Sequence, residues 1–140
     1  MKLRGYDKII AECNLAPFKI RVQSLERTFI DKLFAIADYY LVNEKSEHSR
    51  HLYDLYKIKN NIIFDNDFYE LFNDVKNERK THEKCLSAMD NISLAEVLKK
   101  IVEKDYYKSD YEDITCNLLF EIVDYKTVKD SLTDIIEKFK

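Results

Sequence analysis

The fold of this chain depends on the stretch SLERTFIDKLFAIADYYLVNEKSEHSRHLYDLYKIK (residues 24–59), which predicts two helices joined by a short polar turn. Ser24 is a suitable N-cap for the first helix, and Glu26 suits the positive end of the helix dipole. Apolar residues then recur at helical spacing and predict one buried face: Phe29, Leu33, Ile36, Ala37, Tyr40 and Leu41. Ser46 and Ser49 both offer an N-cap for the second helix. The short turn makes the two helices antiparallel neighbours.

The predicted helix pair brings a small group of charged side chains together. Arg50 and Asp54 are four residues apart, so they lie on one face of the second helix and within reach of each other. Lys32 lies in the middle of the first helix, and its long stem can reach the same cleft. A cation, a carboxylate and a guanidinium in one cleft can bind phosphate or take a proton from a nucleophile. Helical surfaces carry many Arg–Asp pairs, however, and spacing alone favours a structural role.

The order of these residues points beyond a surface ion pair. The run "LERTFIDKL…RHLYDLY" resembles the C-terminal half of the AbiEii-type nucleotidyltransferase toxins, a branch of the DNA-polymerase-β-like superfamily. That family carries an "ERTF-x-EK" helix followed by an "R-x-x-R-H-x-x-D" helix. Asp31 stands where the family has Glu, and Glu47 stands where the family has the first Arg. The segment "DYEDITCNLLFEIVDYKTVKDSLTDI" loosely resembles the closing pattern of the family.

The resemblance implies roles for six residues of the helix pair. Lys32 and Asp54 occupy the positions of active-site residues and are expected to be catalytic. Four neighbours are expected to bind substrate or its phosphates: Arg27, Thr28, Arg50 and His51. In this reading Lys32 holds the triphosphate, and Asp54 positions or deprotonates the attacking hydroxyl. The activity implied is nucleotide transfer from an NTP to an acceptor such as tRNA, in a toxin–antitoxin or phage-defence context.

The part of the family site that binds metal is missing from this sequence. Family members use Mg²⁺ and NTP, with a Gly-Ser turn for the triphosphate and an Asp-x-Asp pair for the metal. Two such carboxylates bridge metals that neutralise charge during phosphoryl transfer. Gly5 is the one glycine here, and the one Asp-x-Asp, residues 65–67, follows the second motif and reads as a helix cap. The chain therefore resembles a nucleotidyltransferase without its metal-binding half, and no cofactor is expected to bind it alone.

Composition predicts a single all-α domain over residues 1–140, a bundle of about six helices with a short extended segment near the N-terminus. One Gly and one Pro leave few turn signals, which favours helices. The formal charge of −3 argues against a broad nucleic-acid-binding surface. No stretch is long and apolar enough for a membrane span, and the three cysteines have no CxxC spacing. They are expected to be free thiols in a reducing cytoplasm.

The domain divides into an arm (residues 1–23), the motif helix pair (24–59) and C-terminal helices (60–140). Residues 18–22 alternate apolar and polar as in a strand; they can pair with another copy, form an extended arm or stay unpaired. Further helices are predicted over residues 67–85 (capped by Asp65), from 94 to about 104 (capped by Ser93), over 111–120, and near the C-terminus with Thr127 as a cap. His82 with Cys85, and His48 with His51, have metal-ligand spacing but no third ligand.

Two further readings remain open beside a nucleotidyltransferase half. The chain can be a non-catalytic remnant, or a separately encoded half that needs a partner chain with the Gly-Ser and Asp-x-Asp elements. It can instead be a helical interaction module that docks a partner such as an antitoxin, with self-association through the N-terminal segment. Whether the isolated chain is an enzyme stays undecided at this point.

Overall fold

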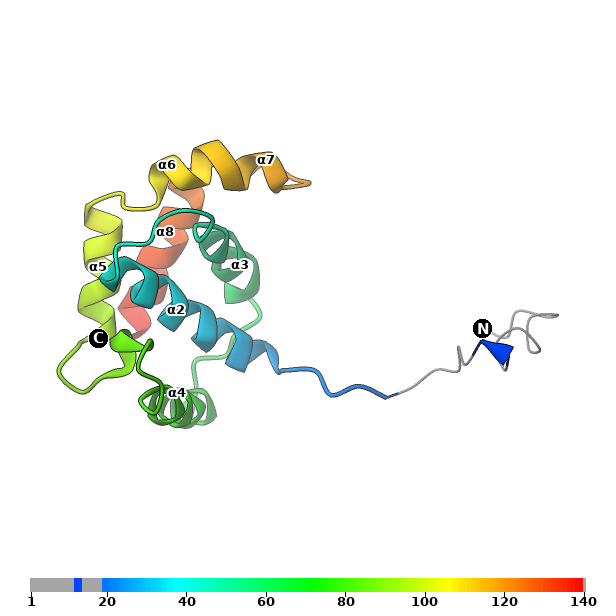
Figure 1. Ribbon diagram of the computed structural model, residues 1–140, viewed down its shortest axis with the longest axis vertical. Helices are drawn as coiled ribbons and strands as arrows, with labels where there is room; N and C mark the ends of the chain where they lie inside the picture. Colours follow the sequence, from blue (N-terminus) through cyan, green and yellow to red (C-terminus); the bar gives the residue numbers. More distant parts are fainter. Residues whose placement is uncertain (1–11, 14–18, 140) are drawn as a thin grey trace.

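The computed structural model describes residues 12–13 and 19–139, and within them every regular element is helical (Figure 1). The longer helices are α2 (Leu25–Leu41), α3 (Arg50–Lys59), α4 (Asn66–Arg79), α5 (Leu94–Glu103) and α8 (Tyr125–Ile136). The shorter ones are η1 (Leu86–Ala88), α6 (Lys108–Asp110), η2 (Tyr111–Thr115), α7 (Cys116–Leu118) and η3 (Glu137–Phe139). Because η2 is a π-helical stretch between α6 and α7, residues 108–118 form one helical segment with a widened turn. The predicted all-α bundle is confirmed.

Helix α2 is the centre of the bundle. It packs against α3, α4, α5 and η1, and α8 packs behind against α3 and α5 (Figure 1). Six apolar side chains of α2 have no exposed surface: Phe29, Ile30, Leu33, Phe34, Ile36 and Ala37. Such a continuous buried face contributes about 1.5–3 kcal/mol for each large side chain, before the entropy cost of ordering the chain. Four residues of the predicted stripe are thus buried, whereas Tyr40 and Leu41 are only partly buried, and Ile30 and Phe34 extend the buried face beyond the prediction.

Three of the predicted helix caps are confirmed. The Ser24 hydroxyl accepts from the Arg27 N–H at 3.1 Å, and the Asp65 carboxylate accepts from the Phe68 N–H at 3.0 Å. Ser93 caps α5 in the same way. The cap predicted for the last helix was wrong, because Asp124 precedes Thr127 and accepts its N–H, so α8 begins at Tyr125.

The start of α3 also differs from the prediction. Ser49 stands at the N-cap position but makes no capping bond, because its buried hydroxyl bonds that of Thr115 at 2.7 Å. Asp110 instead supplies acceptors from a distant part of the chain. Its carboxylate oxygens accept from the N–H groups of Glu47 at 2.8 Å and Ser49 at 3.0 Å. The polar turn before α3 is thus fixed by the segment that contains α6.

Two predicted helices have different boundaries in the structure. The helix expected over residues 67–85 ends at Arg79, and turns occupy the residues from 80 to 84. The segment expected over 111–120 begins earlier, at Lys108, and ends at Leu118.

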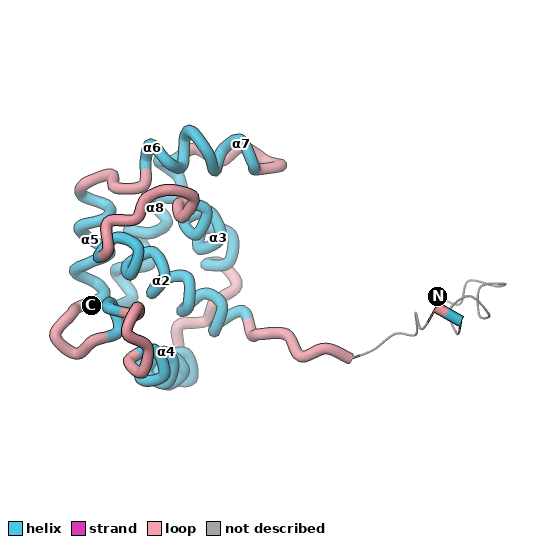
Figure 2. The backbone as a smooth tube through the Cα atoms, in the orientation of Figure 1, coloured by secondary structure: helices cyan, strands magenta, loops and turns pink. Residues whose placement is uncertain are grey.

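The N-terminal segment forms an extended arm. Residues 19–23 run away from the bundle (Figure 2), with Ile20 and Val22 exposed and no strand among the described residues. Phe18, also part of the predicted alternation, lies outside the described residues. No helix in the described part of the chain is long and apolar enough to cross a membrane.

Candidate functional site

The side chains of Lys32 and Asp54 meet between α2 and α3. The Lys32 ammonium donates to Asp54 Oδ2 at 2.6 Å, with side-chain exposures of 22% for the lysine and 37% for the aspartate. Lys32 lies on α2 and Asp54 on α3, so the pair joins two neighbouring helices. The two residues named from the motif therefore lie together, within reach of solvent, as the spacing predicted.

His51 lies one turn before Asp54 on the same helix, with its Nδ1 4.0 Å from Asp54 Oδ2. Burial, and to a smaller extent the positive charge of Lys32, lower the pKa of His51 to about 4. The imidazole is therefore neutral at pH 7. Its Nδ1 atom is buried and has no hydrogen-bond partner among the described residues. The neutral ring and the Asp54 carboxylate beside it therefore belong to one site.

Three parallel rings extend this site toward the C-terminal end of α2. The ring of Tyr39 stacks on that of His48, with centroids 3.4 Å apart and planes 6° apart. The ring of His51 is parallel to both, with its centroid 6.2 Å from Tyr39 and 6.5 Å from His48. The two histidines predicted as an incomplete metal pair thus belong to an aromatic stack.

Arg50 does not pair with Asp54, although the two are one turn apart. The side chain is exposed, and no described carboxylate lies within ion-pair distance of it. Instead it lines a small cavity of about 140 Å³ with Glu47, Ile114 and Leu118. Arg50 therefore stands at the edge of the site as an available cation.

Arg27 and Thr28 do not join Lys32 and Asp54. The Arg27 guanidinium contacts Asp31 at 3.1 Å and Glu78 at 2.8 Å, on the side of α2 that faces α4. Burial alone would lower the pKa of Arg27, but the hydrogen bonds to Glu78 and Asp31 outweigh this effect and raise it. The Thr28 hydroxyl donates to the Ser24 carbonyl at 2.9 Å. Both side chains thus have partners within the protein.

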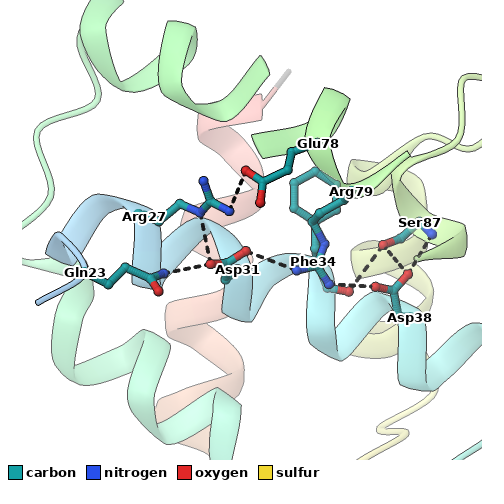
Figure 3. Close-up of polar contacts among 8 residues, drawn as sticks. All are labelled: Gln23, Arg27, Asp31, Phe34, Asp38, Glu78, Arg79 and Ser87. Atoms are coloured by element: carbon teal, nitrogen blue, oxygen red, sulfur yellow. Dashed lines mark hydrogen bonds and ion pairs between the residues drawn. The ribbon is translucent and has the colours of Figure 1, made fainter. Parts of the chain in front are cut away.

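A second polar network fixes α2 against α4 and η1 (Figure 3). The Arg79 guanidinium donates to Asp31 and to Asp38, each at 3.0 Å, and lies over the Phe34 ring. Asp38 is 7% exposed and also accepts from the Ser87 N–H and hydroxyl, both at 2.7 Å. Every partner of Asp38 is a donor, so its buried charge is well compensated. This network is structural and joins α2 to α4 and η1.

Among the described residues, no group of three or more His, Cys, Asp or Glu side chains is placed to hold a metal ion. Neither Asp65 with Asp67 nor His82 with Cys85 belongs to such a group. Asp65 is the N-cap of α4. The carboxylates of the described helices therefore do not fit the Mg²⁺ that the family resemblance implies.

The geometry adds three residues that the motifs did not indicate. Tyr39 is seven residues after Lys32, a spacing that places both residues on one stripe of α2. The helical period could therefore have indicated Tyr39 from the sequence. Asp38 and Arg79 become partners only when α2 and α4 pack together, which no local pattern indicates. The complete arrangement offers an ammonium and a carboxylate for polar chemistry, and an aromatic stack beside them.

The comparisons with known proteins agree with the motif reading. The family model described as "Nucleotidyl transferase AbiEii toxin, Type IV TA system" matches residues 3–132. No curated protein and no solved structure matches the chain. Because the family model spans nearly the whole sequence, including both motif helices, the chain belongs to the AbiEii family of nucleotidyl transferase toxins of type IV toxin–antitoxin systems.

Proposed function

We propose that the α2–α3 face binds the triphosphate of an NTP and activates the acceptor in nucleotide transfer. The observation that supports this most is the Lys32–Asp54 pair at 2.6 Å, which offers a donor cation and an acceptor carboxylate at one solvent-reachable point. Lys32 binds phosphate oxygens as a mobile point charge. Arg50, which has no described ionic partner, adds a second positive charge at the edge of the site.

In the proposed reaction an acceptor hydroxyl attacks the α-phosphorus of the NTP. The new O–P bond forms as the bond to the bridging oxygen of the β-phosphate breaks, and pyrophosphate leaves. Asp54 accepts the proton of the hydroxyl, and Lys32 balances the charge of the phosphates. Neutral His51, next to Asp54, adds no positive charge that would compete with this proton transfer. The acceptor proposed from the family resemblance is a tRNA.

The metal chemistry of the family needs carboxylates that the described helices do not provide. We propose that these carboxylates come from outside the described helices, from a catalytic half that docks on the α2–α3 face. On this proposal the 140-residue chain alone binds NTP but does not turn it over. Mixing it with a Gly-Ser…Asp-x-Asp half restores incorporation of labelled nucleotide.

The test is binding of inorganic tripolyphosphate, measured by calorimetry on the full chain. Lys32→Met is expected to weaken binding about tenfold or more, because one charge-assisted contact is lost. The matched control is Lys59→Met, since Lys59 has the same 22% exposure and pairs with Asp134 on α8, away from the site. Asp54→Asn is expected to keep or strengthen binding yet abolish transfer in the mixture. Equal binding by wild type and Lys32→Met would refute the proposed role of Lys32.

A second candidate function is docking of a partner protein such as an antitoxin. Three large apolar side chains at the end of α7 and just after it support it, with exposures of 73% for Leu118, 108% for Phe120 and 81% for Ile122. Such a group of exposed apolar side chains is typical of an interaction site. The test is co-purification with the protein encoded beside this chain. Phe120→Ser is expected to abolish it, whereas Ile63→Ser, at a distant site with 73% exposure, should not.

A further inference from the structure

Two exposed segments of this chain, far apart in the sequence, carry complementary side chains. The first is the described part of the arm, residues 19–23, which leaves the bundle before α2 (Figure 1). The second comprises residues 118–122, at the end of α7 and in the loop after it, and is called the tip below. Both segments extend toward the same side of the bundle in Figure 1. Neither contributes a residue to the Lys32–Asp54 pair.

Large apolar side chains are exposed in both segments. On the arm, Ile20 is 68% exposed and Val22 is 79% exposed. On the tip, Phe120 is the most exposed large apolar side chain of the described residues, and it stands between Leu118 and Ile122 in the sequence. Because removal of apolar surface from water is the main driving force of association, both segments favour contact with another apolar surface.

The charges beside these apolar side chains have opposite signs. Residues 19–23 include Lys19 and Arg21 and no acidic residue. The segment from residue 109 to residue 124, which contains the tip, has no basic residue and five acidic ones: Asp110, Glu112, Asp113, Glu121 and Asp124. The arm is therefore basic and apolar, whereas the tip and its surroundings are acidic and apolar, a combination that favours contact between the two.

Two cations of α3 lie beside the tip without cancelling its charge. Lys57 donates to Glu121 at 3.0 Å, in a pair whose side chains are 41% and 72% exposed. Arg50 lines a small cavity with Leu118. An ion pair as exposed as that of Lys57 is weak, so it leaves Glu121 available to a second cation. The five acidic residues also outnumber the two cations.

The arm matches the tip better than any other exposed apolar group of the described chain does. Val42 and Ile63 have no basic residue within two positions of them in the sequence. The cation nearest to Leu25 in the sequence is Arg27, which is already engaged by Asp31 and Glu78. Contact of one arm with a second arm, or of one tip with a second tip, would place like charges together. Charge therefore favours contact of an arm with a tip.

The arm is directed away from its own bundle. Residues 19–23 form no backbone hydrogen bond with the described part of the chain. Their printed polar contact is that of Gln23, whose side-chain amide donates to Asp31 at 2.7 Å, next to the start of α2. The backbone and the apolar side chains of the arm are thus open to a second molecule.

We propose that two copies of the chain associate by placing the arm of each copy on the tip of the other. Ile20 and Val22 cover the Phe120 side chain, and Arg21 contacts Glu121. The contact occurs twice about a two-fold axis, which gives a closed dimer. Because two five-residue segments bury less surface than a stable dimer needs, the expected dissociation constant is on the order of 10–100 μM.

This dimer is independent of NTP binding at Lys32. It uses the surface that the second candidate function assigns to a partner protein. A second copy and such a partner would therefore exclude each other at the tip.

The test is sedimentation equilibrium of the full chain over concentrations that span the expected dissociation constant. The wild type is expected to pass from monomer to dimer. Arg21→Glu and Glu121→Lys each place like charges together, so each is expected to weaken association about tenfold or more. An equal mixture of the two variants should associate as the wild type does, because both contacts of the mixed dimer again pair opposite charges. Lys84→Glu, exposed in the turn after α4, changes the net charge as Arg21→Glu does and should dimerise normally.

The apolar part of the contact is tested separately. Val22→Ser and Phe120→Ser are each expected to weaken association about tenfold or more, because each removes apolar surface from the contact. The matched control is Ile63→Ser, which removes an equally exposed apolar side chain at a distant site. Circular dichroism of each variant checks that the helices remain folded.

Three results would overturn the proposal. A wild-type chain that stays monomeric at every concentration excludes the dimer, and if Phe120→Ser still abolishes co-purification with a partner protein, the tip belongs to that partner alone. A dimer that is unchanged by Arg21→Glu and Glu121→Lys uses another surface. A mixture of these two variants that associates no better than either variant alone shows that the arm of one copy does not contact the tip of another. None of these results bears on tripolyphosphate binding at Lys32, which tests the phosphate site independently.

Discussion

The Lys32 ammonium and the Asp54 carboxylate are 2.6 Å apart, and they form the ionic link between the exposed sides of α2 and α3. His51 Nδ1 lies 4.0 Å from the same carboxylate oxygen. The charges of Lys32 and Asp54 act on His51 in opposite directions, the lysine lowering its pKa and the aspartate raising it. The imidazole of His51 is therefore a spectroscopic reporter of the candidate site.

The first prediction concerns the pKa of His51 in charge variants. Lys32→Met is expected to raise it from about 4, because the positive charge that disfavours the imidazolium is gone and Asp54 is left unneutralised. Asp54→Asn is expected to lower it for the opposite reason. NMR titration of the imidazole protons measures both shifts, and Lys59→Met is the control. If His51 titrates identically in both variants, the three side chains do not interact as described.

The second prediction is a loss of stability in mild acid. His51 is neutral in the folded protein down to about pH 4, whereas in the unfolded chain it binds a proton below its ordinary pKa of about 6.5. Between these pH values the unfolded state holds more protons, so the free energy of unfolding falls as the pH falls. The expected loss from this residue is roughly 2 kcal/mol, reduced from the full conversion because the ring is partly solvated. Urea unfolding at pH 7 and pH 4.5 measures it, and His51→Gln should remove this part of the pH dependence.

Much of this fold was predictable because its signals are local. The apolar spacing of residues 29–41 gave the buried face of α2, and Ser24, Asp65 and Ser93 gave three helix starts. The meeting of Lys32 with Asp54 followed from two facing helices and a short turn between them. These features depend on neighbours within one or two turns, or on one short connection, so the sequence pattern carries them.

The features that the sequence did not predict depend on contacts between distant segments. Ser49 does stand at the N-cap of α3, but its hydroxyl bonds Thr115 instead, and the turn before the helix is held by Asp110, about sixty residues away. Arg27 forms ion pairs with Asp31 and Glu78 because α4 packs on that side of α2. The motif could not indicate this helix packing. The cavity at Tyr39 likewise forms only where Glu83 and Leu86 approach the end of α2.

The third prediction concerns the network around Arg79. Its guanidinium bridges Asp31 and Asp38, and the side chains of Arg79 and Asp38 are 18% and 11% exposed. Arg79→Met is expected to cost about 2–4 kcal/mol of folding free energy, because it leaves the buried Asp38 charge without its guanidinium. Arg79→Lys should recover only part of this loss. The ammonium restores a positive charge, but it cannot bind both carboxylates in the fixed geometry of a guanidinium. Chemical denaturation measures the series, and Lys126→Met, on the exposed face of α8, is expected to leave the midpoint unchanged.

The fourth prediction tests the cap that Asp110 supplies to the turn before α3. Its two carboxylate oxygens accept from the Glu47 and Ser49 N–H groups, and Glu47 has a φ of 66°, a left-handed conformation that costs a non-glycine residue about 1 kcal/mol or more. Asp110→Ala removes both acceptors and is expected to destabilise the fold by about 1–2 kcal/mol. Asp110→Asn keeps one acceptor oxygen and should have a smaller effect.

Glu47→Gly provides the complementary test, because glycine adopts the left-handed conformation without strain. It is expected to leave stability unchanged or raise it by up to about 1 kcal/mol, despite the greater freedom of glycine in the unfolded chain. The turn also carries His48, so loosening it should disturb the stack on Tyr39. Asp110→Ala is therefore also expected to shift the NMR resonances of the His48 imidazole, which lies over the Tyr39 ring. Normal stability and unchanged His48 resonances in Asp110→Ala would show that the turn is held by other contacts, with the buried Ser49–Thr115 hydrogen bond the first to examine.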